Sequence, residues 1–163
     1  MKYQLRPLGP DHKTSVMDIF NYYIQNSFSA FFTTCLPHGC FDALLQACRG
    51  YPALALEDES GQAVGFGLLK PFHPGDAVKR TAELSYFITP DCTRQGLGRM
   101  LLEKMTEEAR KMGIDNLVAS VSSQNEASLR FHQQNGFSEA GRIRSAGRKF
   151  EQEFDIVIFQ KRV

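Results

Sequence analysis

The sequence lacks any apolar run near the roughly 20 residues that span a bilayer, and its first residues show no secretory signal. Net charge is also small, because 19 Lys and Arg stand against 18 Asp and Glu. No overall field would therefore draw the protein onto nucleic acid or an anionic membrane. We expect a cytoplasmic protein that holds any anionic ligand at a local site.

Paired metal-ligand motifs are missing as well. The four cysteines form no CxxC pair, and no histidine stands at zinc-ligand spacing from them. This pattern argues against a disulfide framework and against a metal site, so we expect free thiols and no metal. Repeats and low-complexity segments are absent too. The 163 residues, 42% of them hydrophobic, predict a single domain over 1–163.

Hydrophobic periodicity predicts alternating strands and helices. We expect strands near 3–8, 53–57, 64–69, 82–89, 117–121, 137–143 and 153–160, and helices near 11–23, 41–48, 98–112 and 125–134. The strand, helix and strand from 82 to 121 require a parallel crossover, whereas 53–57 and 64–69 read as a hairpin. The fold class predicted is α/β (α+β), with a mixed, mostly antiparallel sheet and helices on both faces.

A glycine turn joins the strand ending at Thr89 to the helix near Gly98. The first turn of a helix has unpaired backbone N–H groups and the positive end of the helix dipole, which together suit a phosphate. No Lys-Ser/Thr pair completes a Walker A motif, and Leu101 replaces the last glycine of GxGxxG. The turn favours a pyrophosphate ligand other than ATP or NAD. A plain tight turn is the alternative from the glycines alone.

Four segments resemble the GCN5-related N-acetyltransferase superfamily, and within it the phosphinothricin or methionine sulfoximine acetyltransferase branch. They are ELSYFITPD at 83–91, QGLG at 95–98, NEASLRFH at 125–132 and NGF at 135–137. The likeness extends more loosely to 19–23 and 51–55. It implies the GNAT fold, with the central sheet splayed at an acetyl-CoA cleft, and homodimers are common among such proteins.

The resemblance also implies a cofactor site. Pantetheine would lie between two splayed parallel strands, and the glycine turn would hold the pyrophosphate. Asn125 would contact the pantetheine or thioester region, or only cap the following helix. Gln134 stands where relatives often carry a Lys, and Thr93 where they often carry Arg or Gln. The implied cofactor-binding residues are Tyr86, Phe87, Ile88, Arg94, Gln95, Gly96, Leu97, Gly98, Arg99, Asn125 and Gln134.

Transfer to an amine needs a base, because an alkyl amine with a pKa of about 10 is mostly protonated at neutral pH. The resemblance places a general base at Glu83, acting directly or through a water; a surface carboxylate is the alternative. His132 occupies a position where many members carry a tyrosine. It is a candidate proton shuttle or substrate contact, or a locally bonded histidine. Cys92 has no His-Asp constellation, so we expect direct attack in a ternary complex.

The acceptor is expected to be a small, amino-acid-like primary amine. Aromatic residues would surround it, and two basic residues before the catalytic strand would meet a carboxylate or phosphinate. The candidate substrate residues are Phe31, Phe32, Phe72, Tyr86, Lys79, Arg80 and Ser85. The alternatives are a peptide or protein amine and a non-catalytic acyl-CoA-binding sensor. The absent Walker lysine disfavours a nucleotide-binding module.

Overall fold

The computed structural model describes residues 2–163. Seven strands form one sheet in the order β1-β2-β3-β4-β5-β7-β6. Their bounds are β1 Gln4–Pro7, β2 Ala53–Glu57, β3 Ala63–Pro71, β4 Thr81–Ile88, β5 Asn116–Ser122, β6 Ser138–Lys149 and β7 Gln152–Arg162. Every neighbouring pair is antiparallel except β4 and β5. The predicted mixed, mostly antiparallel sheet is confirmed.

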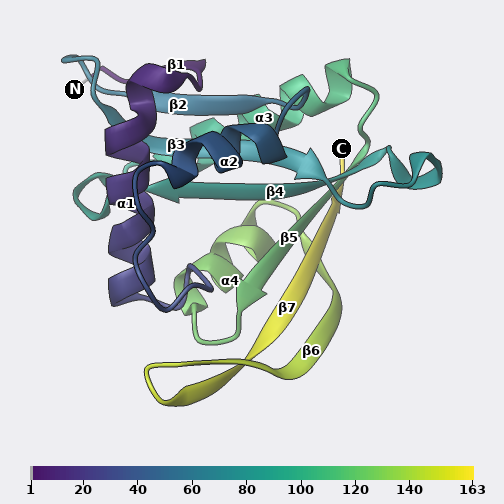
Figure 1. The fold of residues 1–163 in the computed structure, drawn as a ribbon. Helices are drawn as coiled ribbons and strands as arrows, with labels where there is room; N and C mark the ends of the chain where they lie inside the picture. Colours follow the sequence, from purple (N-terminus) through teal and green to yellow (C-terminus); the bar gives the residue numbers. More distant parts are fainter. Residues whose placement is uncertain (1) are drawn as a thin grey trace.

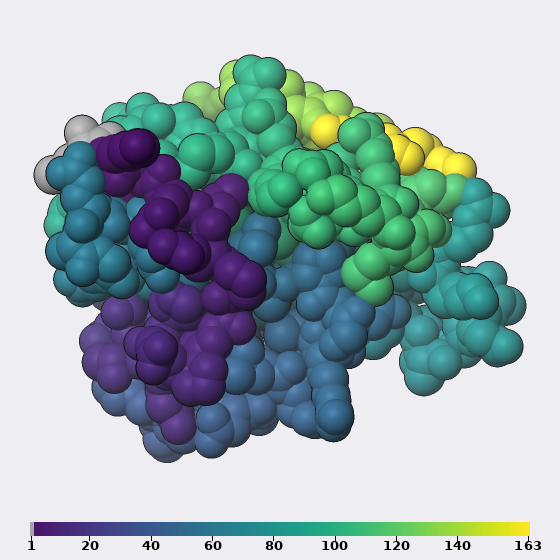
Figure 2. Space-filling model, turned by 90° about the horizontal axis from the view of Figure 1, so that it is seen from above, coloured from purple at the N-terminus to yellow at the C-terminus, as the bar shows by residue number. Residues whose placement is uncertain are grey.

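Helices cover both faces of the sheet (Figure 1). They are α1 Lys13–Asn26, α2 Cys40–Ala47, α3 Leu97–Lys111 and α4 Glu126–Gln134. Seen from above, the purple and blue N-terminal segments lie on one side of the molecule and the green and yellow C-terminal segments on the other (Figure 2). The predicted covering of both faces is therefore confirmed.

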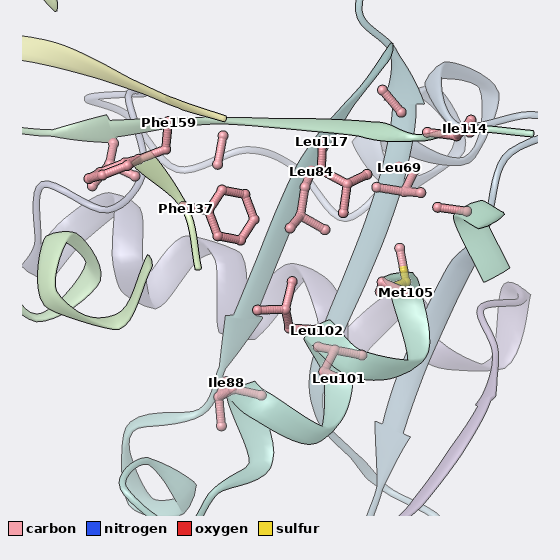
Figure 3. Packing of buried hydrophobic residues seen from close by; sticks show 14 of the residues in the cluster. Leu69, Leu84, Ile88, Leu101, Leu102, Met105, Ile114, Leu117, Phe137 and Phe159 are labelled. Atoms are coloured by element: carbon pink, nitrogen blue, oxygen red, sulfur yellow. The ribbon is translucent and has the colours of Figure 1, made fainter. Parts of the chain in front are cut away.

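Two hydrophobic clusters follow from the alternation of side chains along the central strands. Leu69 and Leu84 project toward α3, where they meet Leu101 and Met105 (Figure 3). Phe66 and Leu68 project to the opposite face and pack with residues of α1 and α2. Each fully buried side chain of this size contributes about 1.5–3 kcal/mol. The core thus holds β3 and β4 rigidly between two helical layers.

The last two strands are longer than the predicted ranges 137–143 and 153–160. β6 continues through the polar segment 144–149, where no apolar alternation marks a strand. Backbone pairing with β7 extends this edge strand, although the register shifts between Ile143 and Gly147. The prediction was wrong here because the stabilising partner is another strand, which the local pattern does not show.

β4 and β5 separate after a short contact. Only Thr81 to Glu83 of β4 pair with Asn116 to Val118 of β5, and no further pairing joins these two strands. Figure 1 shows β5 turning away from β4 beyond this point. Since parallel strands normally continue their ladder side by side, the separation opens a wedge in the sheet with Glu83 at its narrow end.

Three further features concern the described residues. No helix among 2–163 is long and apolar enough to cross a membrane. All four cysteines are free thiols. No group of His, Cys, Asp or Glu within this range is arranged to hold a metal ion.

Candidate active site

A cleft of about 1310 Å³ occupies the wedge between β4 and β5 and continues toward α1 and α2. Most predicted site residues line it. These are Phe31, Phe32, Glu83, Ser85, Tyr86, Phe87, Ile88, Arg94, Gly96, Gly98, Arg99, Asn125, His132 and Gln134. The cleft therefore joins residues from the N-terminal loop, the splayed strand, the glycine turn and α4.

The free edge of β4 offers backbone groups to the cleft. Leu84 to Ile88 line the cleft and have no partner on β5 among the described residues. Buried backbone groups normally find partners, so an extended ligand lying along β4 would satisfy them. One of these groups is already taken, because the Tyr23 hydroxyl donates to the Ile88 carbonyl at 2.5 Å. In the sequence, the position of Tyr23 indicates only one face of a helix.

The glycine turn suits an anion. Gly96 has φ +79° and Arg94 has φ +60°, so two nearby left-handed residues bring backbone N–H groups into the turn. The N-terminus of α3 has no side-chain cap and no acidic residue in its first turn. Its N–H groups and the dipole are thus available to a phosphate. The turn thus has the features expected of a pyrophosphate site, and this assignment stays a prediction.

Residues of the glycine turn differ in which of their groups are available to a ligand. Leu97 is buried in the core, so only its backbone is available to a ligand. Gln95 does not line the cleft and instead bonds Tyr3 and Asp91. The Arg99 guanidinium lies 2.8 Å from Glu103 on the next turn of α3. Arg94 precedes α3 and forms no ion pair with the described residues. Of the two arginines, its guanidinium is therefore better placed to bind a phosphate.

Asn125 caps α4 and reaches across the cleft. Its Oδ1 accepts from the Ser128 backbone N–H at 3.2 Å, and its Nδ2 donates to the Ser29 hydroxyl at 2.9 Å. The capping role is therefore present, and the same amide ties α4 to the loop after α1. Gln134, at the other end of α4, also lines the cleft.

Partly buried Tyr86 and buried His132 form a pair on the α3 and α4 side of the sheet. The His132 Nδ1 donates to the Ser128 carbonyl at 2.8 Å, since a carbonyl can only accept. The Nε2 of the neutral ring therefore accepts the Tyr86 hydroxyl proton at 2.9 Å. Burial lowers the pKa of His132, partly offset by the Ser128 bond, and burial also raises the pKa of Tyr86.

Glu83 lies on the opposite face of β4, together with Ser85 and Phe87. Its carboxylate lies 3.4 Å from the ammonium of Lys70, its direct partner on β3. Both side chains line the cleft. Lys70 is a charged cleft residue that sequence reasoning missed, because β3 shows only an apolar run ending in a lysine.

Aromatic side chains line the cleft as a wall on the same face of the sheet as Glu83. Phe20 contacts Phe32 and Phe87 edge-on, at centroid distances of 5.9 and 5.2 Å. Phe31 stacks on Phe154 of β7 at 5.8 Å. This wall is anchored by Lys149, which is only 4% exposed and donates to the Ala30 carbonyl at 2.7 Å. No motif in the sequence marks Lys149 for this role.

Three predicted substrate residues lie elsewhere. Phe72, Lys79 and Arg80 belong to the connection between β3 and β4 and do not line the cleft. Figures 1 and 2 both show this teal segment projecting from the edge of the molecule. Arg80 pairs with Asp115 at the start of β5. The structure therefore does not bring these residues to the proposed substrate.

The sheet opened between parallel strands, beside a basic helix N-terminus without a side-chain cap, matches the acetyl-CoA cleft that the sequence resemblance implies for an acyltransferase. The chain belongs to the acetyltransferase (GNAT) family, whose family model matches residues 21–137. It is accordingly an acetyl-CoA-dependent N-acetyltransferase.

Individual proteins agree with this assignment. The chain is 29% identical to the L-methionine sulfoximine/L-methionine sulfone acetyltransferase of Pseudomonas paraeruginosa, over 98% of this chain and 94% of that protein. It superposes with a TM-score of 0.91 on yncA from Salmonella typhimurium, solved with its cofactor acetyl-CoA, at 26% identity over 99% and 94% of the two chains. The same score relates it to the ribosomal-protein-alanine N-acetyltransferase of Brucella melitensis, at 28% identity over 98% and 99%.

Proposed function

We propose that this chain, as one domain over residues 1–163, transfers acetyl from acetyl-CoA to the primary amine of a small amino-acid-like substrate. The observation that carries this proposal is the position of Glu83. Its carboxylate lies at the narrow end of the wedge, on the face with the aromatic wall, while the free edge of β4 runs toward the glycine turn. The amine and the cofactor would thus approach one point from two directions.

The cofactor would be held by the chain's own free groups. The backbone of Tyr86, Phe87 and Ile88 would bind the pantetheine arm, with the Ile88 carbonyl shared with Tyr23. The N–H groups of 94–99 and the Arg94 guanidinium would hold the pyrophosphate. Asn125 and Gln134 would add polar contacts from α4. Acetyl-CoA bound there supplies an acetyl thioester and a thiol leaving group.

Glu83 would remove the proton that the amine loses, directly or through one water. A carboxylate beside a cationic amine first binds it and then accepts its proton, which produces the neutral nucleophile. We propose direct attack of this amine in a ternary complex. Ser85 projects on the same face of β4 and lines the cleft, where its hydroxyl can contact the acceptor.

His132 would take part through Tyr86. The Nε2 of His132 faces the Tyr86 hydroxyl, so any proton that this imidazole exchanges with the cleft passes through that hydroxyl. The proposed proton shuttle to the leaving group is therefore a pair of residues. His132 itself is only 3% exposed, so Tyr86 is its route to the cleft.

The amino-acid-like acceptor is supported by two observations. The Pseudomonas relative is named for L-methionine sulfoximine and L-methionine sulfone, both amino acids. The cleft on the Glu83 face is lined mainly by apolar side chains of α1, α2 and β3, which suit a small apolar substituent.

A peptide or protein amine is the second candidate, because the Brucella neighbour is named for a ribosomal protein's alanine. Both Phe31 and Phe32 are about half exposed at the mouth of the cleft, where a peptide could contact them.

A non-catalytic acyl-CoA sensor is disfavoured by the presence of Glu83 within the cleft. The cytoplasmic location and the homodimer stay predictions.

Calorimetric titration with acetyl-CoA, followed by thiol release in the same preparation, tests the proposal. The amines would be amino acids, sulfoximines, polyamines and short peptides. Turnover of amino acids is the expected result. Turnover of peptides alone would favour the second candidate, binding without turnover would favour the sensor, and no binding would refute the cofactor site.

A further inference from the structure

Lys70 and Glu83 place opposite charges side by side at the acceptor end of the cleft. They are direct partners across β3 and β4, and their charged atoms lie 3.4 Å apart. Lys70 is also 39% exposed in its side chain, and both residues line the cleft. No step of the proposed mechanism uses the ammonium of Lys70.

The other charges lining the cleft belong to its cofactor end. Among the described lining residues with Lys, Arg, Asp or Glu side chains, the remaining three are Arg94, Arg99 and Arg130. Arg94 and Arg99 follow the end of β4, while Glu83 is near its beginning. The five residue steps from Glu83 to Ile88 span about 17 Å of extended strand. Among these charged lining residues, Lys70 is therefore the positive one at the acceptor end.

The ion pair leaves Lys70 able to bind a ligand. A partly exposed pair of this kind contributes at most about 1 kcal/mol, and an ammonium has three donors. One interaction with Glu83 at 3.4 Å does not occupy these donors. An incoming carboxylate can thus share the ammonium, while the incoming amine takes the place of Lys70 beside Glu83. After these exchanges, Lys70 still has a negatively charged partner and Glu83 still has a positively charged partner.

The surroundings decide what else the acceptor carries. On the same face of the cleft, Leu68 lies two residues before Lys70 on β3, and Met17 and Leu44 pack in one cluster with Leu68. A charged substituent buried against these side chains would lose hydration without a partner. An uncharged, apolar substituent would gain by burial. The adjacent charges of Glu83 and Lys70 match an amine and a carboxylate that are attached to the same carbon atom.

We propose that Lys70 is a specificity-determining residue that binds the acceptor's carboxylate, so that the enzyme selects free α-amino acids with uncharged side chains. This inference deepens the proposed function and rests on it for the position of the amine. Peptides blocked at the carboxyl end and simple amines lack the group that Lys70 recognises. They are therefore poor acceptors.

Binding experiments separate this role from catalysis. Protein saturated with coenzyme A, which cannot donate acetyl, would be titrated with L-methionine, L-leucine and L-phenylalanine and with the carboxamide of each. A charge-assisted bond predicts at least about tenfold tighter binding of an acid than of its amide. Lys70→Met should remove this preference, while Lys70→Arg should keep part of it.

Lys13→Met is the matched control. Lys13 is 38% exposed and lies 3.4 Å from Asp42, so it resembles Lys70 in exposure and pairing but does not line the cleft. This variant should keep the preference for the acid. Thermal melting of all variants would verify that they fold, and Lys70→Gln offers a second neutral side chain.

Two results would overturn the proposal: equal binding of acids and amides by the wild type, or an unchanged preference in both neutral Lys70 variants. Thiol release from acetyl-CoA is measured separately. Acid-selective binding that depends on Lys70 without thiol release would refute the transferase proposal and leave the recognition site in place. Thiol release without a preference for acids would support the transferase proposal and refute the recognition of the carboxylate by Lys70.

Discussion

The Tyr86 hydroxyl on β4 lies 2.9 Å from Nε2 of His132 on α4, in the layer between the splayed strand and the helix that follows β5. The Ser128 carbonyl fixes the other ring nitrogen as the donor. A neutral imidazole is therefore built into the site, stacked on Phe159 and edge-on to Phe137. Protonation would remove the acceptor that Tyr86 requires.

Stability should consequently fall in mild acid. Burial lowers the pKa of His132 below its ordinary 6.5, so below that pH the unfolded chain binds more protons than the folded chain. The free energy of unfolding should then decrease by up to about 1.4 kcal/mol per pH unit as pH falls. Denaturant unfolding from pH 7.5 to 5.5 measures this slope. His132→Gln should flatten it, and the exposed His73→Gln should not; equal slopes in all three proteins would contradict the assignment.

Glu83→Gln should lower kcat by about 100-fold or more, because the amide cannot accept a proton in the transition state. The Kd for acetyl-CoA should stay within about twofold, since the cofactor groups lie on the backbone and the glycine turn. Steady-state thiol release and calorimetry measure the two quantities. If the Glu83→Gln variant kept the wild-type kcat across the pH range, Glu83 would be excluded as the base.

Arg94→Ala should weaken acetyl-CoA binding by about tenfold, because a guanidinium bond to phosphate is charge-assisted. Arg99→Ala should have a smaller effect, since Arg99 is already paired with Glu103. Glu103→Gln should strengthen binding slightly by releasing that arginine. Titrations at low and high salt measure all three variants. A larger loss for Arg99→Ala than for Arg94→Ala would reverse this ranking.

Lys149→Met should raise KM for the amine by about tenfold, because the Ala30 carbonyl and the neighbouring wall of Phe31 lose a charged donor. The Kd for acetyl-CoA should change little. Lys161→Met is the control, since Lys149 lies over the Phe150 ring and Lys161 over the ring of Phe137, which belongs to the connection between α4 and β6. An equal effect on amine and cofactor would indicate a general loss of structure instead.

Gly147→Ala should lower the free energy of unfolding by about 1–3 kcal/mol, because a Cβ there would clash with the buried ring of Phe154. The displaced ring also supports Phe31, so KM for the amine should rise. Gly141→Ala in the same strand meets nothing within 4 Å and should be within about 0.5 kcal/mol of wild type. Equal stability of the two variants would disprove the packing argument.

Much of this fold can be predicted from the amino-acid sequence. Period-two and period-3.6 patterns predict the central strands and the four helices, because each element buries one face against its neighbour. The glycine turn and the Asn125 cap are local, so residue type and spacing suffice to predict them. Segment 144–149 was missed because its strand depends on pairing with β7.

The sequence by itself therefore determined the order of elements and the glycine turn before α3, and it indicated a carboxylate near the wedge. Tertiary structure alone decided which side chains meet. Tyr86 and His132 are 46 residues apart, and Lys149 and Ala30 are 119 apart. Register across β3 and β4 sets Lys70 against Glu83, whereas Lys79 and Arg80 are carried away on a projecting loop. Such contacts depend on strand register and layer packing between distant segments, which no local pattern encodes.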